Sequence, residues 1–379
     1  MRIGVSIISQ NYGDWDRFEA EERGEPVPAV PAVPDLQIFR EELALAVEAD
    51  RLGFDSVWTV EHHFTPYTMI TNPLQYLTYL AGVTEHVDLG TMVTVLPWHH
   101  PVRVAEDVAM LQAFLGDRRR VIAGVGRGLA RREFRGLGLD QSEARGRFDE
   151  SLQVVRNLLR DGRITFHGEQ FQLDSVRLRP QTGRDLSDRL WCAAGSPETL
   201  DITAKHDIQP LIIPTQSVDS ALEGVRYYMR LRDGYGFGPT ETKLALWAYV
   251  GESEAEAREG ADYMGNFGES GIRHYELNSD YHKDVRGYQH YAAYSEALRG
   301  DPSIHRKAMY EGHPWGTAEQ VIEKITSTAR AFGATEVMCM FRYGGMPLDQ
   351  AKASLHRFAR DVLPALHAVE IEPLAVSTV

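Results

Sequence analysis

Short apolar runs rich in β-branched residues alternate along this chain with longer stretches whose apolar residues recur at helical spacing. Such alternation indicates a parallel sheet whose strands are joined by helices, because parallel strands need long crossover connections. Eight runs are expected to be strands: Ile3–Ile8, Phe54–Val60, Val87–Leu96, Arg120–Val125, Leu190–Ala194, Ile208–Pro214, Lys243–Val250 and Glu336–Phe341. A helical pattern follows each of them, at residues 38–52, 73–81, 102–115, 145–159, 197–205, 220–232, 317–332 and 348–366.

Eight strand–helix units favour a closed (β/α)8 barrel, the TIM-type α/β fold. An open doubly wound sheet is the alternative that the pattern leaves open. The 379 residues, of which 43% are hydrophobic, suffice for a core of this size. We expect a single barrel domain over residues 1–369 and a frayed C-terminal tail over residues 370–379.

Three stretches exceed what a minimal barrel needs and are expected as insertions after strands 1, 4 and 7. Residues 11–34 contain the proline-rich run GEPVPAVPAVP, which predicts an extended loop. Residues 162–180 predict a hairpin. Residues 260–314 are rich in Gly, Tyr and His and have only weak helical periodicity.

The third insertion is a candidate lid, because the loops that follow barrel strands build the active sites of such barrels. A helical insertion that serves oligomerisation is the alternative. The candidate lid contacts are Tyr263, Tyr275, Tyr281 and Tyr288.

Charge and cysteine content exclude several classes of protein. The 40 Lys and Arg against 54 Asp and Glu give a net charge of -14, which disfavours nucleic acid or an anionic membrane as a partner. Two cysteines, Cys192 and Cys339, are too few for a disulfide framework or a cysteine-rich metal site. No apolar stretch approaches the roughly 18–20 residues of a membrane helix, and the N-terminus has the pattern of a strand rather than of a signal peptide. We therefore expect a cytoplasmic enzyme.

A pair of histidines, His62 and His63, lies where the second strand ends, which in a barrel is the catalytic rim. Because neighbouring residues of a strand point in opposite directions, at most one of the two faces a pocket directly. A histidine there is suited to act as a general base or to stabilise an anion. HExxH spacing and a Cys/His cluster are both absent, so the pair does not indicate a metal site. A structural role is the alternative.

Two segments suggest a site for an anion. GVGRGL (124–129) is neither a dinucleotide fingerprint nor a P-loop, but its glycines permit close approach of a ligand and Arg127 can pair with a phosphate. AGSPET (194–199) begins a helix, with Ser196 as N-cap and proline next. The hydroxyls of Ser196 and Thr199 then lie at the positive end of the helix dipole, and Arg145 is also available. An ordinary capped helix without a ligand is the alternative.

Taken together, six segments resemble the bacterial luciferase-like flavin-dependent monooxygenase family. They are EHHF (61–64), NPL (72–74), LGTMVTVLPWHHPVRVAEDVAML (89–111), VGRGL (125–129), AGSPET (194–199) and FRYGGMPL (341–348), and they follow the family's order over nearly the whole chain. The resemblance implies a TIM-type barrel that uses reduced FMN (FMNH2) and O2. It implies that a C4a-(hydro)peroxyflavin forms and transfers one oxygen atom to an organic substrate. It also implies a separate NAD(P)H:flavin reductase and a homodimer.

The resemblance assigns roles to individual residues. His62 matches the family's active-site histidine near the reactive edge of the flavin, and Glu61 is expected to tune it. Met92 and Val93 match the pair whose peptide bond is often non-prolyl cis and packs against the flavin ring. The phosphate-binding positions match Arg127, Arg145, Ser196 and Thr199, with Gly195 supplying backbone. No metal site is implied.

One position departs from the light-emitting members of the family: Gly126 stands where they have a cysteine beside the flavin. We therefore expect a monooxygenase that emits no light. The aromatic residues of the candidate lid suggest an apolar or aromatic small-molecule substrate.

Three alternatives remain at this stage. One is an F420-dependent dehydrogenase on the same barrel, and another is a non-catalytic flavin-binding protein. The third is a metal-dependent hydrolase that uses some of His62, His63, His99 and His100.

Overall fold

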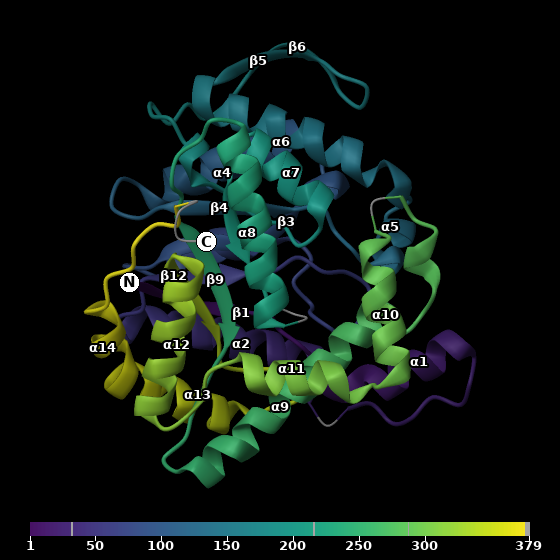
Figure 1. Cartoon of the computed structure of the whole chain (residues 1–379), viewed down its shortest axis with the longest axis vertical. Coiled ribbons are helices and arrows are strands. Elements are labelled where there is room, and N and C mark those ends of the chain that lie inside the picture. Colours follow the sequence, from purple (N-terminus) through teal and green to yellow (C-terminus); the bar gives the residue numbers. More distant parts are fainter. Residues whose placement is uncertain (32, 215–216, 287, 376–379) are drawn as a thin grey trace.

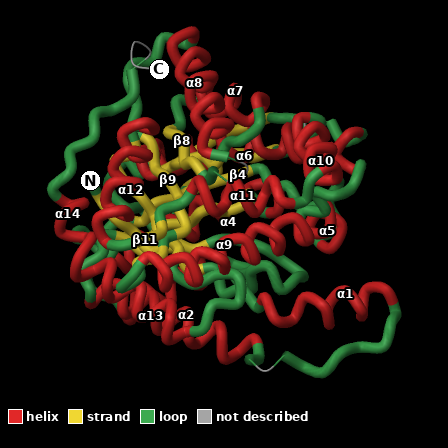
Figure 2. Tube along the Cα trace, turned by 60° about the horizontal axis from the view of Figure 1, so that its bottom comes forward, coloured by secondary structure: helices red, strands yellow, loops and turns green. Residues whose placement is uncertain are grey.

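The computed structural model of the chain describes residues 1–31, 33–214, 217–286 and 288–375. Its centre is a closed barrel of eight parallel strands in the order β1-β12-β9-β8-β7-β4-β3-β2, which confirms the expected fold class. Figure 2 shows these strands enclosed by helices. The strands are β1 (Arg2–Ile7), β2 (Ser56–Thr59), β3 (Asp88–Val95), β4 (Val121–Gly126), β7 (Leu190–Ala193), β8 (Gln209–Ile212), β9 (Thr242–Trp247) and β12 (Ala334–Met340).

The outer helices pack on the barrel through apolar side chains, and each lies close to where the sequence predicts it. They are α2 (Asp35–Arg51), α3 (Pro73–Val83), α4 (Pro101–Leu115), α6 (Ala144–Asp161), α7 (Pro197–Lys205), α8 (Val218–Gly234), α12 (Ala318–Phe332) and α13 (Leu348–Arg357). The last predicted helix is interrupted: α13 passes through a π-helical turn at Phe358–Val362 into α14 (Leu363–His367). Pro364, in the first turn of α14, lacks the N–H that a continuous helix needs.

The barrel interior contains a buried ion pair between Lys243 and Glu336, from neighbouring strands. The ammonium group of Lys243 also lies 4.3 Å from the ring centre of Trp191, and Ser56 donates a hydrogen bond to Glu336. Because both charges are paired and hydrogen-bonded, the interior tolerates them.

The first insertion differs from the expected extended loop. Its first half forms a turn at Tyr12–Asp14 and then helix α1 (Trp15–Arg23), which ends at Gly24 with a φ of 66°. The prolines lie only in the second half, so they do not oppose this helix. Trp15 is buried and donates a hydrogen bond from Nε1 to Oγ of Ser270, 3.0 Å away. The first insertion is therefore tied to the third.

The second insertion is an antiparallel hairpin of β5 (Arg163–His167) and β6 (Gln172–Arg177), which lies at the edge of the molecule in Figure 1. The third insertion is mostly helical. It contains most of α9 (Glu254–His274), the 3-10 turn Tyr281–Lys283, α10 (His290–Gly300) and α11 (Ser303–Gly312).

The glycines of α9 explain why its helical pattern is weak in the sequence, since glycine disfavours helices. A Cβ atom at Gly268 would lie 2.6 Å from Cδ2 of His305 on α11, so the two helices pack closely there. A short parallel pair, β10 (Tyr249–Val250) and β11 (Trp315–Gly316), joins the two ends of this insertion.

Part of the C-terminal segment expected to be a frayed tail, residues 370–379, packs against the rest of the protein. Leu374 is buried, and its backbone exchanges two hydrogen bonds with Thr240, of 2.9 and 3.0 Å. Residues 376–379 of the expected tail lie outside the described residues.

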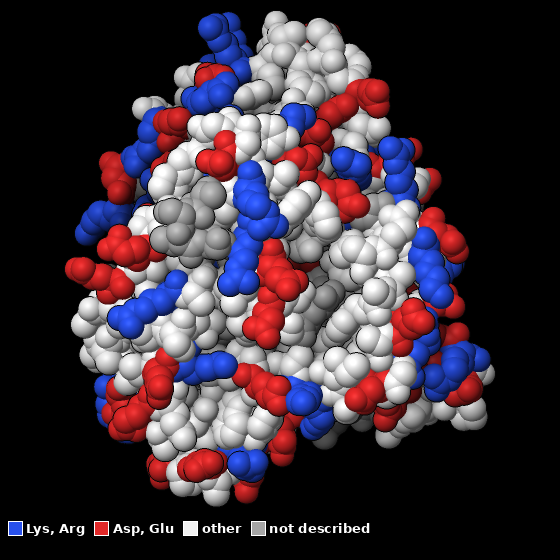
Figure 3. All heavy atoms as spheres, in the orientation of Figure 1, with Lys and Arg blue, Asp and Glu red and all other residues white. Residues whose placement is uncertain are grey.

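Charged side chains of both signs are interspersed over the face shown in Figure 3. Among the described residues, no helix is both long and apolar enough to cross a membrane.

Candidate active site

A cavity of about 270 Å³ opens at the carboxyl ends of the barrel strands, where barrels of this kind place their active sites. The third insertion supplies one of its walls, including Phe267, Tyr275 and Tyr291. Eight of the residues that the sequence singles out line this cavity: Glu61, His62, Met92, Val93, Arg127, Gly195, Ser196 and Thr199.

Arg145 is not brought to this cavity. It is exposed in the first turn of α6, and it is not among the residues that line the cavity. The spacing along the sequence does not distinguish Arg145 from Arg127, but only Arg127 follows directly on a barrel strand.

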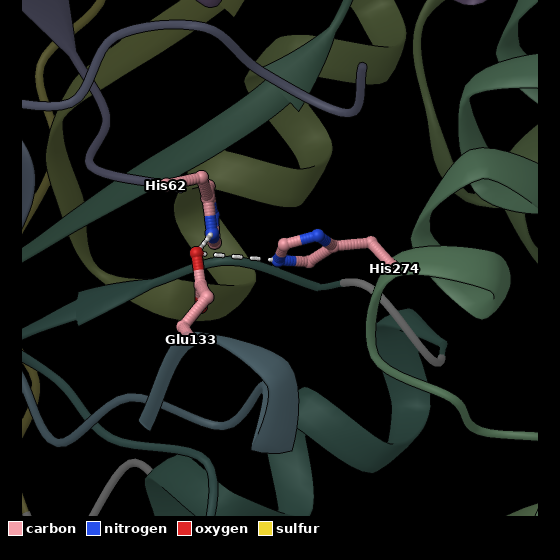
Figure 4. A group of neighbouring side chains, drawn as sticks. All are labelled: His62, Glu133 and His274. Carbon is pink, nitrogen blue, oxygen red and sulfur yellow. Dashed lines mark hydrogen bonds and ion pairs between the residues drawn. The ribbon is translucent and has the colours of Figure 1, made fainter. Parts of the chain in front are cut away.

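His62 is held between two partners. Its Nδ1 lies 3.0 Å from Oε1 of Glu133, which belongs to the short helix α5 (Arg131–Gly136), and its Nε2 lies 3.2 Å from the hydroxyl of Tyr275. Figure 4 shows His62 and His274, the last residue of α9, both pointing toward Glu133. Nε2 of His274 lies 3.4 Å from the same carboxylate oxygen.

Glu133 is fully buried and negatively charged. Burial by itself raises its pKa, but the charges and hydrogen bonds of His62 and His274 outweigh burial and hold the pKa well below its usual range. The backbone N–H of His63 donates a further hydrogen bond to Oε1, at 2.7 Å. His274 is itself buried, which lowers its pKa to about 4, so it is neutral near pH 7. The carboxylate therefore fixes the orientation of the His62 ring.

Among the described residues, the hydrogen-bond partners of the Glu61 side chain do not include His62, and the expectation that Glu61 tunes this histidine stays a prediction. Its Oε1 lies 2.6 Å from Nε2 of His99 and 3.4 Å from Nε2 of His63, and its Oε2 accepts the N–H of Val95 at 2.7 Å. Burial raises the pKa of Glu61, but the hydrogen bonds from His63 and His99 lower it overall. Glu61 lies two residues beyond β2, and its bond to Val95 ties this segment to the end of β3.

The residues of the candidate anion site include two at the start of α7, Ser196 and Thr199. Oγ of Ser196 accepts the N–H of Thr199 at 3.2 Å, and the two hydroxyl oxygens lie 2.9 Å apart. The guanidinium group of Arg127 is 6% exposed and lies 4.3 Å from the ring centre of Tyr288, whose hydroxyl donates to the carbonyl of Gly128 at 2.9 Å. Two hydroxyls at a helix N-terminus and an arginine thus line the same cavity, and groups of this kind are suited to bind phosphate.

Met92 and Val93 also line the cavity, and the peptide bond between them is cis, as the resemblance implies. Beside it, Gly126 leaves room for Val93: a Cβ atom at position 126 would lie 2.6 Å from Cγ2 of Val93. A cysteine at this position would require Val93 to move.

The tyrosines of the candidate lid take different positions. Tyr275 reaches His62, and Tyr288 covers Arg127. Tyr281 lies farther out, where its ring covers Arg131 and its hydroxyl donates to Gln141 at 2.8 Å. Tyr263 packs, partly buried, among the apolar residues of α9.

Glu133 and His274 were not among the site residues expected from the sequence. Glu133 is the one acidic residue in the run RREFR (131–135), which begins five residues after the end of the fourth strand, and this acidic residue near a strand end was the available signal. His274 carries no such signal, because its place depends on how α9 packs.

His62, Glu133 and His274 each offer an atom that can bind a metal ion, and these atoms lie within 4.8 Å of one another. The other histidines of the hydrolase alternative do not join them, since His63 and His99 contact Glu61 and His100 is exposed. Oε1 of Glu133 already accepts a backbone N–H, and its distance of 3.0 Å to Nδ1 of His62 fits a hydrogen bond.

A closed barrel with a cavity at the carboxyl ends of its strands is the arrangement of a barrel enzyme. Residues 19–336 match the model of the luciferase-like monooxygenase family. The chain therefore belongs to the luciferase-like monooxygenases.

Among its relatives, the chain is similar to the alkanal monooxygenase alpha chain of Photorhabdus luminescens, with 25% identity over 343 residues, or 89% of this chain and 94% of the relative. It is 26% identical to the oxygenase component of the flavin-dependent trigonelline monooxygenase of Acinetobacter baylyi, over 89% of this chain and 92% of the relative. Its fold is similar to the crystal structure of monooxygenase RslO1 from Streptomyces bottropensis, with a TM-score of 0.71 and 24% identity, over 96% of this chain and 99% of the other.

Proposed function

We propose that this chain is the oxygenase component of a two-component monooxygenase, which uses reduced FMN and O2 to oxygenate an uncharged, apolar or aromatic substrate without emitting light. The observation that carries the proposal is the pairing, in one cavity, of an anion site at Arg127 and Ser196 with the oriented histidine His62. The name of the trigonelline relative, a flavin-dependent oxygenase component, supports a flavin and a separate second component, for which we propose an NAD(P)H:flavin reductase.

The residues present fit FMN. Arg127, Ser196 and Thr199 would hold its phosphate, and the strand ends at Met92 and Val93 would support its ring system. When bound, reduced FMN supplies the electrons that activate O2. Tyr275 and Tyr291, which belong to the third insertion, line the cavity and would exclude water from the bound flavin.

His62 is the residue that we assign to proton movement. Glu133 accepts the hydrogen of Nδ1, so that Nε2 is the ring nitrogen on the side of Tyr275 and the cavity. His62 thus gives or takes its proton at Nε2, while Glu133 keeps the ring in place and stabilises it when it is charged. Glu133 acts as a positioning residue.

The absence of light emission is supported by the surroundings of Gly126. Val93 occupies the space that a side chain at this position needs, so a cysteine does not fit there without rearrangement.

A homodimer is supported by an exposed apolar face on two neighbouring helices. Four large side chains form it, at i, i+4 spacing on α3 and α4: Tyr79, Val83, Met110 and Phe114.

Equilibrium titrations with FMN and, in parallel, with F420 test this function, followed by oxygen uptake in the presence of NADH and a flavin reductase. We expect preferential binding of FMN and oxygen uptake that a substrate couples to product. Preferential binding of F420 would support the dehydrogenase alternative. FMN binding without oxygen transfer to any compound in a broad screen would support a flavin-binding protein.

A further inference from the structure

One wall of the cavity carries no charge. It is formed by the ends of β8, β9 and β12 and by the third insertion, through Leu211, Ile213, Trp247, Phe267, Met309 and Met340. Among the described residues that line the cavity, the charged ones are Glu61, Arg127 and Glu133, and all three come from segments after β2 and β4. A charged substrate against the apolar wall would lose its hydration without gaining a counter-ion.

Two helices of the insertion place a polar pair in this wall. The hydroxyl of Tyr294, on α10, hydrogen-bonds to Nδ1 of His305, on α11, and both side chains line the cavity. Burial lowers the pKa of His305 to about 4 and raises that of Tyr294, so both are neutral at pH 7. When a phenol donates to Nδ1 of a neutral imidazole, the ring proton lies on Nε2. His305 then offers an N–H donor.

The position of this donor follows from Gly268. A Cβ atom at this residue would lie 2.8 Å from Nε2 of His305, and Gly268 also lines the cavity. The lack of a side chain at position 268 thus lets α9 pack beside the Nε2 edge of the imidazole, and both residues line the cavity.

Trp247 supplies a second donor in the same wall. It is 2% exposed, and its Nε1 has no hydrogen-bond partner among the described residues. Its ring packs against that of His313, with 4.6 Å between the ring centres. A buried N–H without a partner is costly, so a ligand that brings an acceptor oxygen is favoured there.

We propose that the substrate is an uncharged, mainly apolar ring compound whose carbonyl or hydroxyl oxygen accepts hydrogen bonds from Nε2 of His305 and Nε1 of Trp247. This inference rests on the proposed function, because it names the substrate class of the same cavity. Tyr294 is a positioning residue, which keeps the proton of His305 on Nε2.

Three bicyclic probes test it in the whole protein with saturating FMN: 1-tetralone, a neutral ketone; tetralin, which lacks the oxygen; and 2-naphthoate, which is charged. Isothermal titration calorimetry is expected to show about tenfold tighter binding of tetralone than of tetralin, and the weakest binding for naphthoate. Tyr294→Phe and Trp247→Phe should each reduce the ratio of tetralone affinity to tetralin affinity severalfold, while tetralin binding remains measurable. A misfolded variant would lose both ligands, so tetralin binding controls for folding.

Equal binding of tetralone and tetralin would overturn the inference, as would the lack of measurable tetralone binding, tighter binding of naphthoate, or an unchanged preference in both variants. Failure of the proposed function has a different signature, since it would appear as a lack of FMN binding before any probe is added.

Discussion

Glu133→Gln keeps the size of a buried side chain and removes the charge that His62 and His274 face. Two contacts of Oε1 are short enough for strong hydrogen bonds, at 2.7 Å from the N–H of His63 and 3.0 Å from Nδ1 of His62. A hydrogen bond to a charged group contributes about 1.5–3 kcal/mol, against about 1 kcal/mol for a neutral one. The variant should therefore lose about 2–3 kcal/mol of unfolding free energy at pH 7.5.

This loss should depend on pH, with a sign set by the lowered pKa of Glu133. A carboxyl whose pKa is lower in the folded than in the unfolded protein stabilises the fold above its unfolded value of 4.5, and the contribution declines as the pH falls below that value. At pH 4.0 the difference between variant and wild type should be smaller by about 0.8 kcal/mol.

Urea unfolding at pH 7.5 and pH 4.0 measures both quantities. Glu323→Gln, which neutralises an exposed carboxylate on α12, is the matched control and should stay within about 0.5 kcal/mol of wild type at both pH values. A loss at Glu133 that is as small as this control, or that grows toward pH 4.0, would refute the view of Glu133 as a charged anchor for His62.

Three further changes have defined outcomes. Arg127→Ala should weaken FMN binding by about ten- to a hundredfold but leave riboflavin binding unchanged, whereas Arg145→Ala should change neither; fluorescence titration measures both ligands. Gly126→Cys should lower the unfolding free energy by about 1–3 kcal/mol, because its Cβ atom would lie 2.6 Å from Cγ2 of Val93; unchanged urea unfolding would contradict this. Burial raises the pKa of Glu42 to about 7. The unfolding free energy of the wild type should therefore fall by up to about 3 kcal/mol as the pH rises from 4.5 to 7. Urea unfolding of Glu42→Gln at pH 5 and pH 8 should show no such fall.

The sequence predicts the barrel because the signal for each strand is local. Apolar runs such as the one at β3 keep their pattern whatever surrounds them, and eight of them with helices between leave few arrangements. The sequence did not predict helix α1, because the prolines that follow it dominate the pattern of residues 11–34. The side chain of Trp15, which is buried in this helix, donates a hydrogen bond to Ser270, 255 positions later in the chain.

The site was predictable only in part, for a similar reason. His62 and Ser196 stand at strand ends and can be placed from the strand pattern alone. The partner of His62 was assigned to its neighbour Glu61, but neighbouring residues of an extended segment point in opposite directions. The actual partner, Glu133, is 71 residues away and is brought near by the turn after β4. His274 lies at the end of α9, and the glycines of this helix weaken its helical pattern in the sequence.

The reaction of bound reduced FMN with oxygen tests the central claim most directly. The protein is first titrated with reduced FMN without oxygen and then mixed with oxygenated buffer, while absorbance spectra are recorded over seconds. The proposal predicts saturable binding and a transient spectrum that belongs to neither reduced nor oxidised FMN. Failure to bind reduced FMN, together with binding of F420, would contradict it.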